Sequence, residues 1–85
     1  MSTVYYILNY SDFKKHAHML HGTDNVAHSL DDPLTDDSEV ILKLSAPDHI
    51  HHHFEKNDIW SLHPSHEKVT ALATHHPVMK HRGTM

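Results

Sequence analysis

The sequence predicts a single small α/β domain, with a three-stranded, at least partly parallel sheet and three to four packed helices in the order β-α-(α)-β-α-β-α. Short runs of β-branched and aromatic residues alternate with segments of helical periodicity, and helix-start residues follow the runs. Such alternation favours parallel pairing through right-handed helical crossovers. Because 85 residues suffice for only one thin core, we expect residues 1–85 to form one domain.

The first half of the chain contains the clearest strand signal and two expected helices. Residues 3–9 (TVYYILN) are rich in β-branched and aromatic side chains, which is typical of a buried strand. A helix is then expected from Ser11, whose hydroxyl can cap it, to Gly22, which can end it in a left-handed conformation. A second short helix is expected over residues 24–30, with Thr23 as its N-cap.

The strand and helix pattern resumes after an acidic break. Residues 31–38 hold four aspartates around a proline, so we expect an exposed loop there. The apolar run at 39–45 predicts a central strand that is covered on both faces. The sequence SAPD at 45–48 supplies the hydroxyl, proline and carboxylate of a helix start, which predicts a helix to about Lys56.

The last expected elements are shorter. Residues 58–62 (DIWSL) predict a third strand, which contains the only tryptophan of the chain. A final helix is expected to begin at residues 64–65 and to end near residue 76, because Pro77 follows. The C-terminal residues 78–85 are expected to be frayed.

Composition excludes several classes of protein. The chain has no cysteine, which rules out disulfides, thiolate metal sites and cysteine nucleophiles. The formal charge of −4 at pH 7 gives no electrostatic footprint for nucleic acid at neutral pH. No run approaches the roughly 18 apolar residues of a membrane span, and the N-terminus lacks a secretory pattern. These observations predict a cytoplasmic protein that does not bind membranes, and they leave a homo-oligomer open.

Histidine is the most informative residue type, with thirteen copies that fall in clusters. Imidazole is the commonest metal ligand in proteins and titrates near neutral pH. Histidines three or four residues apart share a face of an expected helix, so two rings could reach one zinc, nickel or copper ion. The candidate metal ligands are His18, His21, His49, His52 and His53. No motif requires a cofactor, and weak adventitious binding is the competing interpretation, since chance neighbours are common in so histidine-rich a chain.

The sequence signals for catalysis are weaker than those for metal binding. Two His-x-Ser/Thr triplets, at residues 21–23 and 63–65, could supply the paired acid and base of a small hydrolase. With thirteen histidines and thirteen serines plus threonines, about two such triplets are expected by chance. The chain also lacks a glycine-rich phosphate loop and a GxSxG element. We therefore predict that the protein is not an enzyme and assign no catalytic residue.

The leading interpretation is a small non-catalytic protein-binding module, regulatory or inhibitory, of the kind that accessory factors, phage-encoded ones included, use to act on a host protein. An acidic loop favours a basic partner, and tryptophan is typical of interface hot spots. The candidate protein-contact residues are Asp31, Asp32, Asp36, Asp37 and Trp60. A histidine-rich metal-binding protein is the alternative, and a hydrolase that uses a histidine pair is the third.

Overall fold

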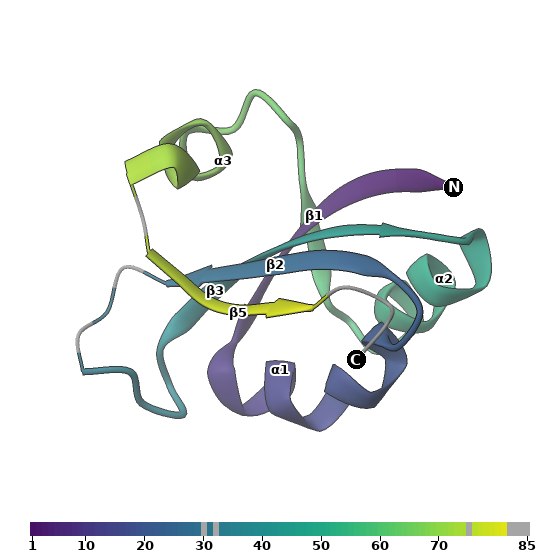
Figure 1. Cartoon of the computed structure of the whole chain (residues 1–85), viewed down its shortest axis with the longest axis horizontal. Coiled ribbons are helices and arrows are strands. Elements are labelled where there is room, and N and C mark those ends of the chain that lie inside the picture. Colours follow the sequence, from purple (N-terminus) through teal and green to yellow (C-terminus); the bar gives the residue numbers. More distant parts are fainter. Residues whose placement is uncertain (30, 32, 75, 82–85) are drawn as a thin grey trace.

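The protein folds around a five-stranded sheet with the strand order β4-β1-β3-β2-β5 (Figure 1). The computed structural model describes the chain except for residues 30, 32, 75 and 82–85. The elements are β1 (Ser2–Asn9), α1 (Tyr10–His16), the 3-10 helix η1 (Ala17–Leu20), β2 (Asp24–Ser29), β3 (Glu39–Ala46), α2 (Asp48–Lys56), β4 (Trp60–Leu62), α3 (Glu67–Thr70), the 3-10 helix η2 (Ala71–Thr74) and β5 (His76–His81).

The predicted three-stranded, partly parallel sheet is wrong, because every strand pair in the described sheet is antiparallel. β1 and β2 both run antiparallel to β3, which lies between them. The β1-α1-β2 crossover therefore does connect two strands of the same direction, but they are not neighbours. Apart from the 3-10 helix η1, the elements from β1 to β4 follow the order β1-α1-β2-β3-α2-β4, which is the split β-α-β connectivity called ferredoxin-like. The parallel crossover expected between residues 3–9 and 39–45 is therefore wrong, because the segment predicted as a second helix is the strand β2, and β1 pairs directly with β3 in the antiparallel sense.

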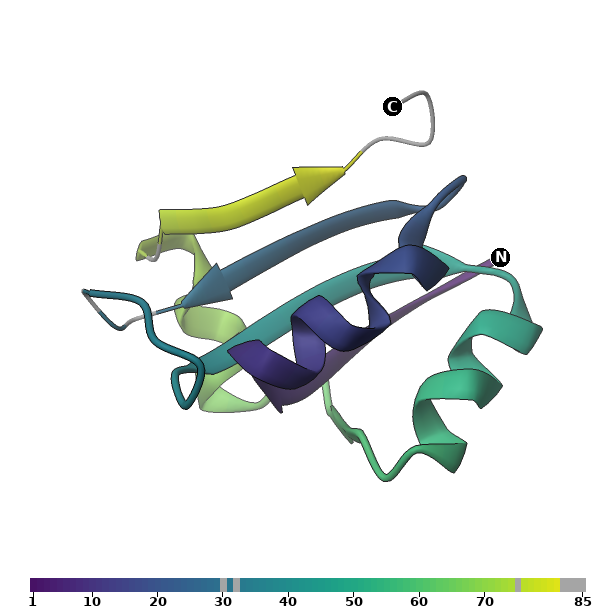
Figure 2. The ribbon, with the colours of Figure 1, turned by 90° about the horizontal axis from the view of Figure 1, so that it is seen from below.

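The main core lies between the sheet and the helices α1, η1 and α2. Figure 2 shows the sheet from the side on which α1 lies along the strands. β1 and β3 turn alternate side chains toward these helices, as the two-residue period of a strand requires. The largest fully buried side chains on this side are Tyr6, Phe13, Leu20, Leu42, Leu44 and Phe54. α3 lies on the opposite side of the sheet in Figure 1, where Lys68 forms an ion pair with Glu39 of β3.

β2 replaces the helix predicted over residues 24–30. Within the described part of this segment, Asn25, Ala27 and Ser29 are buried, whereas the residues between them are at least partly exposed. That is the two-residue period of a strand, and the buried side chains are small, with two of the three polar, rather than large and apolar. Pairing with β3 over six residues satisfies the backbone hydrogen bonds, which outweighs the weak local preference for a helix.

The C-terminal part also differs from the prediction. The single helix expected up to residue 76 is reduced to the short α3 and η2, and β5 begins at His76 instead of a frayed end. Pro77 is compatible with β5 because β5 is an edge strand, where a missing backbone N–H costs no ladder bond on the open side. The register of β2 against β5 shifts between Ala27 and His28. Residues 82–85 of the predicted frayed segment lie outside the described residues.

Three other predicted elements are confirmed. β1 and β3 match the strands expected at residues 3–9 and 39–45, and α2 ends at Lys56 as expected. The predicted caps are wrong at both helices: Asn9 caps α1 in place of Ser11, and α2 begins after Pro47 without a side-chain cap, because Ser45 belongs to β3 and its hydroxyl bonds to that of Thr3. Gly22 has a φ of +78°, the left-handed conformation that glycine adopts most readily, although it follows η1 rather than a continuous α-helix.

Candidate functional site

Three histidines from different elements come together beside the core. His16 ends α1, His18 lies in η1, and His53 lies in α2. The Nδ1 atom of His16 is 3.2 Å from the Nε2 atom of His53, so one of these nitrogens donates a hydrogen bond to the other. The ring centroid of His18 is 6.4 Å from that of His53. We call His16, His18 and His53 the histidine cluster.

The hydrophobic core holds the histidine cluster in position. Phe54 is almost fully buried and packs its ring edge-to-face against both His16 and His53, with centroid distances of 6.0 and 5.8 Å. Partial burial lowers the pKa of His16, and the neighbouring His53, Lys15 and His18 lower it further, whereas Asp12 opposes this shift. The His16 ring is therefore favoured in its neutral form, in which it keeps a lone pair for a donor or a metal ion.

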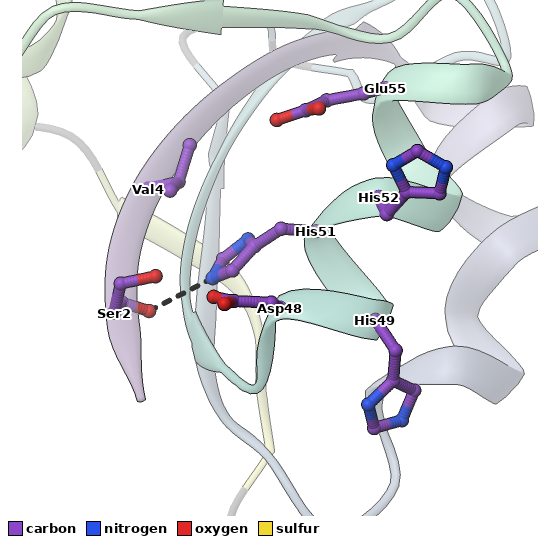
Figure 3. A pocket seen from close by; sticks show the side chains of 7 residues that line it. All are labelled: Ser2, Val4, Asp48, His49, His51, His52 and Glu55. Atoms are coloured by element: carbon purple, nitrogen blue, oxygen red, sulfur yellow. Dashed lines mark hydrogen bonds between the residues drawn. The ribbon is translucent and has the colours of Figure 1, made fainter.

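Only part of the predicted metal site is assembled by the fold. His18 and His53 come together, but His21 lies exposed after η1, and His49 and His52 are exposed on α2. Figure 3 shows the rings of His49 and His52 pointing in different directions. Among the described residues, no group of three donors is already placed to hold a metal ion.

His16 was missed by the sequence pattern because it is two residues from His18, a spacing that puts two side chains on different faces of an α-helix. The change from α1 to η1 at Ala17 alters this relation.

His51 is not a surface ligand but a buried structural residue. Its side chain is 5% exposed, its Nε2 lies 2.9 Å from the carbonyl oxygen of Ser2, and its Nδ1 lies 2.7 Å from the hydroxyl of Tyr6. A carbonyl oxygen can only accept, so Nε2 carries the proton, and in the neutral ring Nδ1 accepts from the Tyr6 hydroxyl. The sequence contains a signal for this, since His51 is three residues before the buried Phe54 on α2.

An open groove of about 540 Å³ lies between α2 and the N-terminal end of β1 (Figure 3). Its lining residues are Ser2, Val4, Asp48, His49, His51, His52 and Glu55. His51 forms part of its wall, yet both ring nitrogens already have partners, so the ring has no free nitrogen for proton transfer. His51 therefore serves as part of the wall of the groove and is not placed to act there as an acid or a base.

The environment of Tyr6 makes stability sensitive to alkaline pH. Burial, together with the charge of Glu55, raises the pKa of Tyr6 from 10.0 to about 12. The unfolded chain loses this proton at a lower pH than the folded protein, so the stabilising contribution is present below pH 10 and is lost as pH rises toward 12. Denaturant unfolding at successive pH values should show this decline, and Tyr6→Phe should reduce it. An equal decline in the variant would contradict the assignment.

The two His-x-Ser/Thr triplets form local turn contacts. The Nδ1 atom of His63 is 2.7 Å from the hydroxyl of Ser65 and also accepts the Ser65 backbone N–H at 3.1 Å, before α3 begins. The buried hydroxyl of Thr23 donates to the carbonyl of Leu20 at 2.6 Å. Both hydroxyls therefore have structural partners within a few residues.

The predicted protein-contact residues fall into two groups. Trp60 lies on the edge strand β4 and is 75% exposed. The acidic loop is attached to α1, because Asp36 forms an ion pair with Lys14 at 2.7 Å and the Tyr10 N–H donates to the carbonyl of Ser38 at 2.8 Å. The side chains of Asp31 and Asp37 are exposed. Asp32 lies outside the described residues.

No protein-family model, curated protein or solved structure matches this chain. Within the described part of the chain, no helix combines the length and the apolar character needed to cross a membrane.

Proposed function

We propose that the protein is a small non-catalytic binding module whose partner is a protein with a basic surface and an apolar pocket for Trp60. The observation that carries the proposal is the position of this side chain, 75% exposed on a three-residue edge strand. A large indole left in water is ready to bury its surface against a partner, and tryptophan is among the residues that dominate interface energies.

The residues around Trp60 support a contact surface rather than an isolated exposed ring. Trp60 is paired with Ile7 of β1, and its side chain therefore lies on the same face of the sheet as those of Ile7 and Leu62. Both neighbours are partly exposed. An aromatic anchor with partly exposed apolar neighbours is the usual centre of a protein interface, around which a polar rim excludes water.

Charge supports a basic partner. The formal net charge is −4. Asp58 is exposed two residues before Trp60, and Asp31 and Asp37 are exposed in the acidic loop. Asp36 is partly neutralised by Lys14, so the remaining carboxylates are more available to an outside cation. Such charges mainly raise the association rate and the specificity.

Trp60→Ala should abolish retention of the partner. The full chain, immobilised in parallel as wild type, Trp60→Ala and the exposed control His52→Gln, is exposed to extract of the native cell. A specific basic protein should be retained by wild type and His52→Gln and lost with Trp60→Ala. Raised salt should slow its association, because screening weakens charge steering.

Trp60 is also an internal reporter, since it is the only tryptophan. Its fluorescence should move to shorter wavelength when the purified partner binds, because the indole leaves water. Equal retention by all three forms would refute the proposal. Concentration-dependent self-association that Trp60→Ala abolishes, measured by analytical ultracentrifugation, would instead show that a second copy occupies the surface, and would also refute it.

The proposed role is regulatory or inhibitory, since binding without chemistry acts by occupying or biasing a partner. A cytoplasmic location remains part of the proposal, supported by the absence of cysteine.

A further inference from the structure

We propose that His16 and His53 form a binding site for a divalent transition-metal ion of the zinc, nickel or copper class, with His18 as a third ligand. This site is independent of Trp60 and lies on the helical side of the sheet. Its ligand atoms are Nδ1 of His16 and Nε2 of His53, which face one another across 3.2 Å.

The spacing of the two nitrogens fits one ion. With metal–nitrogen bonds of about 2.0–2.1 Å in a tetrahedral site, two ligand nitrogens lie about 3.3 Å apart and the centroids of their rings about 5.2 Å apart. The His16 and His53 nitrogens are 3.2 Å apart and the ring centroids 5.3 Å apart. The observed separations therefore match those of a shared ion, and binding would exchange the hydrogen bond for two metal bonds as each ring turns its nitrogen toward the ion.

Two features fix these ligands before an ion arrives. Both rings pack against the buried Phe54, so little side-chain freedom remains to be lost on binding. The two ligands also come from different elements, α1 and α2. An ion held between them would cross-link the two helices of the main core and would stabilise the folded state over the unfolded chain.

His18 completes the site after a side-chain rotation. Its ring centroid is 6.4 Å from that of His53, about 1 Å beyond the tetrahedral value, and its side chain is exposed and free to turn. Water would fill the remaining position. Among charged neighbours, Asp12 favours a cation near His16 and Lys15 disfavours it. The imidazole donor set suits zinc, copper and nickel rather than calcium or magnesium, which prefer oxygen ligands.

Binding needs no covalent step and no net loss of a proton from two neutral rings. In the metal-free pair one nitrogen carries the shared proton, and the ion requires a lone pair on both facing nitrogens. The shared proton moves to the other nitrogen of its own ring, so that ring changes tautomer. Metal ligation by histidine always uses one deprotonated nitrogen in this way.

The test uses the full chain after chelator treatment, titrated with zinc by calorimetry and by thermal unfolding. We expect one saturable site whose occupancy raises the folding equilibrium constant about 100-fold when free zinc is 100 times Kd. His16→Gln and His53→Gln should each weaken binding at least about tenfold, since even outer-shell changes cost 10–100-fold. His18→Gln should have a smaller effect. The matched control is the double variant His49→Gln with His52→Gln, which should bind as wild type does.

A second measurement uses only the wild-type protein and therefore does not depend on whether a variant folds. Substoichiometric copper should broaden the imidazole NMR signals of His16 and His53 in the wild-type protein before those of the exposed histidines. Absence of a saturable site, first broadening at His49 or His52, or full binding by folded His16→Gln and His53→Gln would each overturn the proposal. None of these outcomes bears on Trp60, so this proposal and the proposed protein-binding function fail separately.

Discussion

Phe54→Ala is expected to lower the free energy of unfolding by about 3–5 kcal/mol, the usual cost of removing a buried phenylalanine ring from a core. Phe54 is 1% exposed and its ring lies 5.2 Å from that of Tyr6, between α2 and the sheet. It also supports His16 and His53 from one side. Its removal therefore leaves a cavity and releases the histidine cluster, and metal affinity should fall with stability.

Urea unfolding monitored by circular dichroism measures this effect. The matched control is Trp60→Ala, because Trp60 is an aromatic residue of the same chain that is 75% exposed. Substitutions at exposed positions usually change stability by no more than about 0.5 kcal/mol. If Trp60→Ala destabilised the protein as much as Phe54→Ala, the core would not lie where the structure places it.

The second large effect concerns the buried polar pair of Tyr6 and His51. Tyr6→Phe deprives the His51 Nδ1 atom of its donor, and His51→Leu deprives the Tyr6 hydroxyl of its acceptor and the Ser2 carbonyl of its donor. A buried group left without a partner costs about 1–3 kcal/mol, so each single variant should lose about that much stability. Replacing both partners with apolar groups can be nearly neutral, and the double variant should therefore lose less than the two single variants combined.

Denaturant unfolding of all four forms gives this double-mutant cycle. Additive losses would mean that the two side chains do not interact. A coupling of at least about 0.5 kcal/mol, the low end for residues in contact, would support the hydrogen bond. His63→Leu serves as a control for the general effect of exchanging a histidine, because His63 is exposed.

The sequence predicted those elements whose signals are strong and local. Two dense apolar runs gave β1 and β3, and the start signal before Asp48 gave α2. β2 was mistaken for a helix because its inward residues, Asn25, Ala27 and Ser29, are small and mostly polar, so that neither the helical nor the strand period of apolar residues is prominent. Strand order was beyond sequence reasoning, since pairing between β1 and β3 joins residues about forty positions apart.

Less of the candidate sites than of the fold could be predicted from the sequence. Helical spacing selected five candidate ligands within two segments, and of these the fold brings His18 of one segment near His53 of the other. His16 was missed because the change from α1 to η1 alters side-chain directions. The spacing of His51 from Phe54 on α2 indicates an inward-facing side chain, but its hydrogen-bond partners Tyr6 and Ser2 lie more than forty residues away, and no local pattern identifies them. Exposure of Trp60 likewise depends on β4 being an edge strand.

The fold gives the histidines separate roles, with His51 fixed inside the core and His16 paired with His53. A long-range nitrogen–proton NMR spectrum of histidine-labelled, metal-free protein at neutral pH tests this most directly, because it reports the tautomer of each ring. We expect His51 to exist only with its proton on Nε2, and a hydrogen bond to join Nδ1 of His16 to Nε2 of His53. A His51 ring that averages between tautomers, or spectra that show no hydrogen bond between His16 and His53, would contradict these assignments.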